Sequence, residues 1–128
     1  MDDIRAKIHA AVEILPTERA VSEREAERRA GQFLLIQAHI TDKMDELNHE
    51  KIGTTSILAA IYPKLMAMET SKQVTEKKVN VEGHEDYLAA REAVETIEAQ
   101  LNYLKTYFKI FENAHIFYRQ LAKAEFNG

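Results

Sequence analysis

Apolar residues in the last third of the chain recur at every third or fourth position. The series begins at Tyr87 and ends at Ala122, and no Gly or Pro lies between His84 and Phe126. This spacing is typical of a helix that packs along another helix. We therefore expect one long C-terminal helix over residues 84–125. The members of the series are Tyr87, Ala90, Val94, Ile97, Leu101, Leu104, Phe108, Phe111, His115, Tyr118 and Ala122.

A second apolar row follows only the later half of this helix. A helix with one neighbour buries one stripe of side chains, so a second row needs a second neighbour. The most economical neighbour is another copy of the chain. The sequence therefore predicts a homo-oligomer whose interface is this row. Its members are Tyr103, Tyr107, Ile110, Ala114, Phe117 and Leu121.

A similar apolar series runs from Ala26 to Met68 and predicts a long helix over residues 22–70. Ser22 and Glu25 have the spacing of a capping box at its start. Pro63 lacks an amide proton and should kink the helix. An alternative ends the helix at Gly53 and restarts it within residues 54–56. We favour one kinked helix, because the series continues through Gly53 in register. Its polar members are Gln37, Lys51 and Thr54.

The remaining segments are short. Residues 1–16 read as an amphipathic helix that Pro16 ends. Residues 71–83 read as a turn in which Val74 and Val79 begin short extended pieces. The predicted fold is all-α, with a short N-terminal helix followed by a long antiparallel helical hairpin that is coiled-coil-like and oligomeric. The length of 128 residues predicts a single helical domain over residues 1–128.

Composition narrows the function classes. The chain has no Cys, which excludes disulfides and thiolate zinc sites. Its acidic first residues do not form a signal peptide, so we expect the cytoplasm, and the host cytoplasm if a phage encodes the protein. No apolar run is long enough to span a bilayer, so we expect no membrane partner. The net charge of -4 argues against a surface for duplex DNA but allows a local basic patch.

Two Glu-x-x-His pairs occur on the long helices, Glu46/His49 and Glu112/His115. This spacing is used by dimetal carboxylate proteins with four helices. Leu47 lies on the apolar series, which turns Glu46 and His49 outward, and we expect His115 to be a partly buried, hydrogen-bonded histidine. We therefore expect no metal and no other cofactor. The chain also has no phosphate loop and no nucleophile elbow, so we expect no enzymatic activity.

Basic residues cluster in two regions, around the predicted turn and late in the C-terminal helix. The candidate DNA-binding residues are Lys64, Lys72, Lys77, Lys78, Lys105 and Lys109. Tyr103, Tyr107 and Tyr118 lie near the later group, so bases could stack beside phosphate contacts. The alternative is a solvated lysine face with packed tyrosines, and we favour packing for the tyrosines. The run Glu23–Arg29 indicates ion pairs within one helix.

After the predicted long helix, the chain pairs a Thr-Glu-Lys turn with the pattern Tyr-x-x-Ala, then Glu-Ala-x-x-x-x-Leu-Lys, then Arg. The residues of this pattern are Thr75, Glu76, Lys77, Tyr87, Ala90, Glu98, Ala99, Leu104, Lys105 and Arg119. In this pattern and in the order of its helices, the segment 22–123 resembles the phage UvsY-type recombination mediators.

The resemblance implies a homo-oligomeric ring that binds single-stranded DNA, helps displace the single-strand-binding protein and loads a recombinase. The family's basic DNA contacts fall near Ala59 and Ile61, which are apolar. DNA must therefore contact other positions, such as Lys51, Lys64 or the turn lysines. The alternative is a structural or adaptor helical protein, for example a phage assembly factor, that does not bind DNA. A metal-binding bundle enzyme ranks third.

Overall fold

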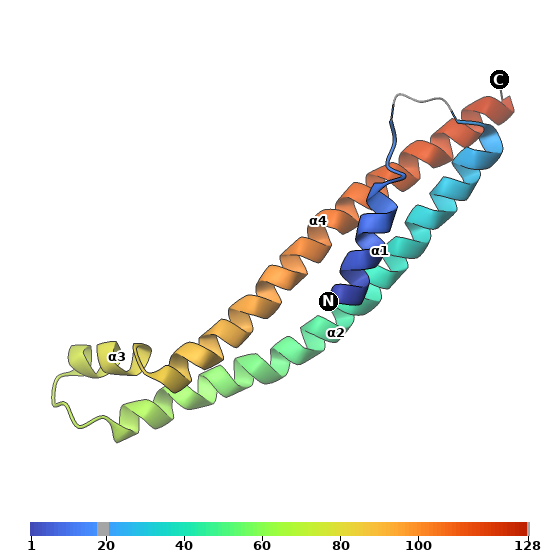
Figure 1. The fold of residues 1–128 in the computed structure, drawn as a ribbon. Coiled ribbons are helices and arrows are strands. Elements are labelled where there is room, and N and C mark those ends of the chain that lie inside the picture. Colours follow the sequence, from blue (N-terminus) through green and yellow to red (C-terminus); the bar gives the residue numbers. More distant parts are fainter. Residues whose placement is uncertain (18–20, 128) are drawn as a thin grey trace. The chain divides into compact units, whose positions relative to one another are not determined.

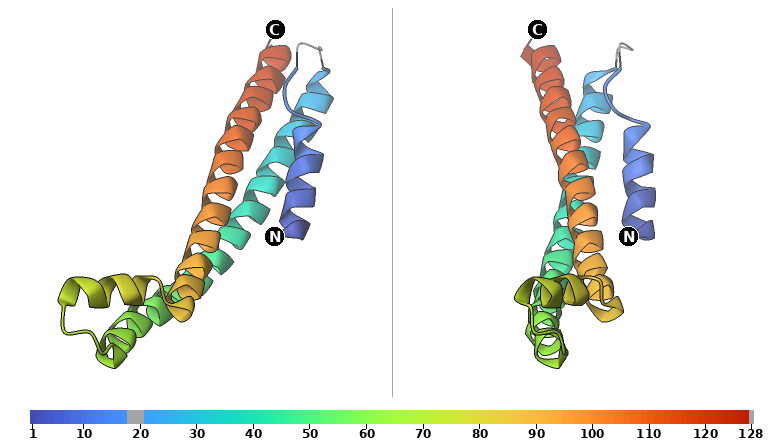
Figure 2. Two further views of the ribbon diagram at one scale, coloured as in Figure 1. Left: turned by 60° about the vertical axis from the view of Figure 1, so that its left-hand side comes forward. Right: turned by 90° about the vertical axis from the view of Figure 1, so that its left-hand side faces the viewer.

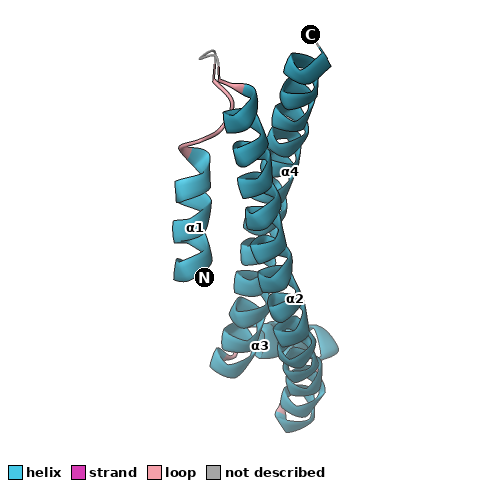
Figure 3. Cartoon of the chain, turned by 90° about the vertical axis from the view of Figure 1, so that its right-hand side faces the viewer, coloured by secondary structure: helices cyan, strands magenta, loops and turns pink. Residues whose placement is uncertain are grey.

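The computed structural model describes residues 1–17 and 21–127, apart from the side chains of residues 124–127. Figure 1 shows the helices in chain order, and Figure 3 shows only helix and loop in the part of the chain that is described. The all-helical prediction is therefore confirmed. The helices are α1 (Asp2–Val12), α2 (Glu23–Met68), α3 (Val74–Glu82) and α4 (Glu85–Asn127).

The chain forms two compact units. Unit 1 comprises Met1–Asp45 and Asn102–Gly128, and unit 2 comprises Glu46–Leu101. Helices α2 and α4 therefore each contribute one part to either unit. The single helical domain over residues 1–128 stays a prediction.

In unit 1, α2 and α4 pack antiparallel through aromatic side chains. The ring of Phe33 lies 5.6 Å from that of Phe111 and 5.9 Å from that of Tyr118, between centroids. Earlier in α2, Ala30 contacts His115 and Arg29 contacts Tyr118. Residue numbers therefore fall along one helix as they rise along the other, so the two helices are antiparallel. Phe33 and Phe111 are fully buried. The apolar series read from the sequence is therefore the seam of this unit.

Helix α1 gives this helix pair a third neighbour (Figure 2). Its side chains Ile4 and Ile8 are buried. The Arg5 guanidinium lies 4.3 Å from the ring centroid of Tyr103 on α4, at the distance of a cation–π contact. Helix α1 ends at Val12, so it is shorter than the predicted segment 1–16, and Pro16 lies beyond its end.

In unit 2, α2 and α4 are again antiparallel neighbours. The rings of Tyr62 and Tyr87 meet edge to face at 5.8 Å, and Lys51 Nζ lies 3.5 Å from Glu98 Oε1. Helix α2 is continuous through Gly53 and Pro63, as the favoured reading of the sequence predicts. The buried apolar side chains of this unit are Leu47, Leu65, Val81, Val94, Ile97 and Leu101.

The turn predicted for residues 71–83 contains the nine-residue helix α3, so the extended pieces predicted at Val74 and Val79 are wrong. Both valines are exposed on this helix, whereas Val81 is buried. Asn80 Nδ2 donates a hydrogen bond of 3.0 Å to Glu69 Oε1. Helices this short depend on tertiary contacts, and these two contacts outweigh the weak helix propensity of the segment.

An isoleucine pair measures how firmly α1 is docked. Ile8 on α1 has no exposed surface, whereas Ile52 on α2 is 68% exposed. We expect Ile8→Ala to lower the free energy of unfolding by about 2 kcal/mol or more, because it leaves a cavity under α1. The same change at Ile52 should cost less than about 0.5 kcal/mol. Urea unfolding followed by circular dichroism measures both, and equal effects would contradict the docking of α1.

Candidate nucleic-acid interface

Four of the predicted DNA-binding lysines belong to unit 2. Lys64 lies near the end of α2, Lys72 lies in the loop before α3, and Lys77 and Lys78 lie on α3. Lys77 is half-buried and the other three are exposed. None of the four forms an ion pair with any residue that the structure describes. Their ammonium groups are therefore available to a phosphate backbone.

Charge is unequally shared between the units. Unit 1 holds eleven Lys and Arg residues and eleven Asp and Glu residues, so its charges cancel. Unit 2 holds six basic and ten acidic residues and carries the net charge of -4. Six of its acids lie between Glu82 and Glu98, at the end of α3 and along the first half of α4. These acids repel phosphates, so the candidate contacts to a nucleic acid in unit 2 are the lysines around the α2–α3 loop.

The other two predicted lysines belong to unit 1, so the structure does not gather all six lysines in one unit. Lys105 and Lys109 are exposed on α4, and Lys109 Nζ lies 3.1 Å from Glu112 Oε1. Neighbouring Tyr103 and Tyr107 are half-buried, with ring centroids 5.0 Å apart. Because these rings pack against each other and Arg5 covers Tyr103, they offer little surface to a base. The preference for packed tyrosines agrees with this arrangement.

The second apolar row of α4 is divided between the interior and the surface of unit 1. Ala114 is buried, and Tyr103, Tyr107 and Leu121 are half-buried. Ile110 and Phe117 remain 38% and 46% exposed. The sequence predicts that the whole row contacts another copy, but Arg5 on α1 of the same chain already contacts Tyr103. The interface between copies stays a prediction, and in this row Ile110 and Phe117 are the side chains most exposed for it.

The two Glu-x-x-His pairs lie as predicted. Glu46 and His49 are exposed on the outer face of α2. His115 is half-buried, and its Nδ1 lies 2.8 Å from the carbonyl oxygen of Ala30. Glu112 is the partner of Lys109. Within residues 1–17 and 21–127, no three His, Asp or Glu side chains gather in a way that could hold a metal ion.

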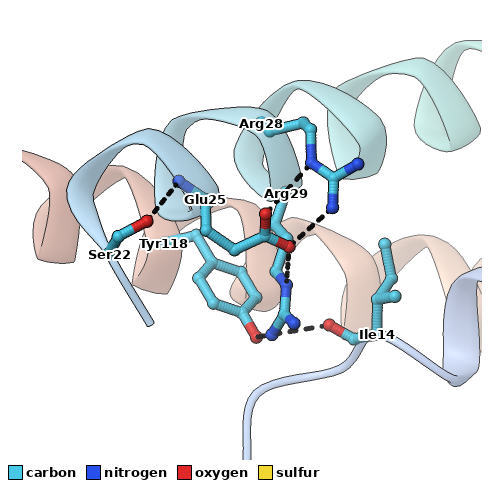
Figure 4. A network of polar contacts seen from close by, with 6 residues as sticks. All are labelled: Ile14, Ser22, Glu25, Arg28, Arg29 and Tyr118. Carbon is cyan, nitrogen blue, oxygen red and sulfur yellow. Dashed lines mark hydrogen bonds and ion pairs between the residues drawn. The ribbon is translucent and has the colours of Figure 1, made fainter. Parts of the chain in front are cut away.

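A polar network begins at the start of α2 (Figure 4). The amide of Glu25 donates a 3.1 Å hydrogen bond to Ser22 Oγ, which is half of the predicted capping box. The Glu25 carboxylate accepts bonds of 2.7 Å from Arg28 and 3.0 Å from Arg29. Hydrogen bonds from Arg28 and then Arg29 lower the pKa of Glu25. These pairs therefore persist at neutral pH and weaken as the pH falls through that lowered pKa.

The network continues across unit 1 through Arg29, which donates a 2.8 Å hydrogen bond to the hydroxyl oxygen of Tyr118. That hydroxyl donates a 3.3 Å bond to the carbonyl oxygen of Ile14. The segment after α1 is thereby tied to both long helices. Sequence reasoning missed this contact, because Arg29 and Tyr118 are 89 positions apart and no local pattern relates them. The arrangement holds α2, α4 and the segment after α1 together.

No helix in the described part of the chain is long and apolar enough to cross a membrane. Comparisons with protein families, with curated proteins and with solved structures give no match to this chain.

A tyrosine pair tests the network. Tyr118→Phe removes a buried hydroxyl with two hydrogen bonds, so we expect a loss of about 1 kcal/mol in the free energy of unfolding. Tyr107→Phe is the matched control, because its hydroxyl has no hydrogen bond within the described residues, and it should change stability by less than about 0.5 kcal/mol. Urea unfolding compares the two variants. A stability of Tyr118→Phe equal to that of wild type would mean that the network contributes nothing.

Proposed function

We propose that this protein is a non-enzymatic recombination mediator that binds single-stranded DNA and assists in loading a recombinase. The observation that carries the proposal is the group of unpaired ammonium groups at Lys72, Lys77 and Lys78, on α3 and the loop before it. Cations on such a patch displace condensed counterions from DNA, which gives affinity without reading the bases. The resemblance of residues 22–123 to UvsY-type mediators supports the same function.

The charge pattern favours a single strand over a duplex. Three lysines beside a strongly acidic helix can neutralise only a few phosphates. A flexible single strand can follow such a small patch and avoid the acidic face, whereas a rigid duplex brings two charged strands with it. Few contacts also mean weak binding. Weak binding suits a mediator, because a mediator must release the strand to the recombinase.

Assembly would strengthen this weak binding. Patches repeated on linked copies of the chain bind one strand with a higher avidity than a single patch. Ile110 and Phe117 on α4 are large apolar side chains that a monomer leaves partly in water. Burying each of them between copies contributes on the order of 1.5–3 kcal/mol. A homo-oligomer, with a recombinase as a further partner, completes the proposal.

A structural or adaptor function is the second candidate. It is favoured by exposed apolar side chains in unit 1 that DNA binding does not use. Leu34 and Leu35 on α2 are 56% and 59% exposed. An adaptor would bind a protein partner there and have no affinity for single strands.

The DNA proposal predicts binding that depends steeply on salt. Changing Lys72, Lys77 and Lys78 to Glu should abolish binding of labelled single-stranded DNA. The slope of log affinity against log salt of the wild type should include a contribution of about 0.7 for each of these contacts. Fluorescence anisotropy at several salt concentrations measures both quantities, and circular dichroism checks that the helices persist.

The control variant changes three other exposed cations, Lys7, Arg24 and Arg91, to Glu. It alters the net charge equally and should keep most of the affinity, since these residues lie outside the patch. Equal losses in the two variants would show that net charge alone governs binding. An absence of binding to any single strand at low salt would support the adaptor.

The α4 row predicts a variant that assembles poorly. Changing Ile110 and Phe117 to Asp should shift the protein toward monomers, because charge is costly in an apolar interface. Changing Glu92 and Glu95 to Lys in the acidic half of α4 should leave the contact through the α4 row intact. Sedimentation velocity at micromolar concentration compares the variants with wild type. A wild-type protein that is monomeric at this concentration would contradict the prediction.

A further inference from the structure

Unit 2 contains a groove between α2 and α4 with a volume of about 440 Å³. Its floor includes Leu65, which is buried. Helix α3, the third helix of unit 2, contributes no residue to the lining of this groove. The two walls of the groove indicate which partner would bind in it.

The α2 wall is a ridge of large side chains. Ile57, Ile61, Lys64 and Met68 follow the four-three-four spacing of one helix face. Ile57 is 57% exposed and Met68 is 68% exposed. The periodicity of the sequence places Met68 on the seam of the hairpin, but the structure leaves it at the surface. The ridge therefore leaves more than half of the Ile57 and Met68 side chains uncovered within unit 2.

The α4 wall is the opposite in shape. It presents Ala89 and Ala90, whose small side chains leave a shallow depression on the helix surface. One chain thus carries both a ridge and a shallow trough of matching apolar character. Ridges fit into grooves when helices pack, so the ridge of one chain is shaped for the trough of another.

The charges on the two walls of the groove are complementary as well. Lys64 lies on the ridge and Asp86 on the trough wall. Lys64 has no ion pair within the part of the chain that is described, and Asp86 meets only the His84 ring, at 3.9 Å. A two-fold axis that sets α2 of one copy on α4 of the other brings Lys64 to Asp86 twice. In such an interface each contact occurs in both directions.

We propose that the unit 2 groove is the docking site for a second copy of this chain, with the Ile57–Met68 ridge of each copy in the alanine trough of the other. The product is a four-helix arrangement built from two helix pairs. It goes beyond the proposed function, because it does not require DNA. It also assigns Lys64 to the contact between copies, which leaves Lys72, Lys77 and Lys78 for the strand. The contact is separate from the α4 row of Ile110 and Phe117.

A matched set of aspartates tests the apolar part. Ile57→Asp with Met68→Asp changes side chains that are exposed in one chain, so the fold should persist while association weakens at least tenfold. Ile52→Asp is the control, because Ile52 is 68% exposed on α2 but does not line the groove. Its association should stay within about twofold of wild type. Sedimentation velocity over a range of concentrations gives the dissociation constants, and circular dichroism confirms the helices.

A charge exchange tests the identity of the occupant. Lys64→Asp and Asp86→Lys should each weaken self-association, because each places like charges together across the two-fold axis. The double variant should regain most of the association, since the pair forms again with its signs reversed. Recovery of self-association is the result expected if residue 64 of one copy meets residue 86 of another. A different protein partner in the groove would give no recovery of self-association.

Three results would overturn the proposal. These are unchanged association in the Ile57/Met68 variant, equal weakening in the Ile52 control, and a double charge variant as weak as the single ones. None of these depends on DNA. Loss of DNA binding in the Lys72/Lys77/Lys78 variant with unchanged sedimentation would leave the groove intact, so the two proposals fail separately.

Discussion

The fold depends on the packing of α2 against α4, and a pair of helices can bury only one stripe on each partner. Both helices carry more apolar surface than that stripe. In unit 1 part of the excess is covered by α1, whose Ile4 and Ile8 are buried, while Ile110 and Phe117 stay partly exposed. In unit 2 the excess remains at Ile57 and Met68, which are more than half exposed. The need for a third neighbour thus explains both the position of α1 and the groove that we assign to a second copy.

The seam could be predicted from sequence because its signal is local and long. Phe33 and Phe111 each belong to an unbroken series with helical spacing, and both are fully buried. Helix α3 could not be predicted, because its stability comes from the burial of Val81 and the Asn80–Glu69 hydrogen bond more than from propensity. Periodicity also shows that a helix face is apolar without showing what covers it. For that reason the pattern predicts that Tyr103 contacts another copy of the chain, although Arg5 of the same chain lies over its ring.

The candidate site was only partly predictable for a related reason. The exposure of Lys72 and Lys78 could be predicted from the polar residues around them in the sequence. No sequence pattern indicates that Lys105 and Lys109 belong to the other unit. The acidic half of α4 repels phosphates, so the DNA contacts that we propose lie on the lysines around the α2–α3 loop. The Arg29–Tyr118 bond has a different role, since it fixes the segment after α1 and keeps the third neighbour of unit 1 in place. Binding and folding therefore use different charged groups.

Hydrogen–deuterium exchange at two protein concentrations tests most directly whether unit 2 lacks a neighbour that another copy supplies. The account predicts that amides in 57–68 and 86–93 exchange more slowly at high concentration, because association covers that groove. Amides of α1 should exchange at the same rate at both concentrations, since α1 already has its neighbours within the chain. Exchange in 57–68 and 86–93 that does not change with concentration would contradict the account.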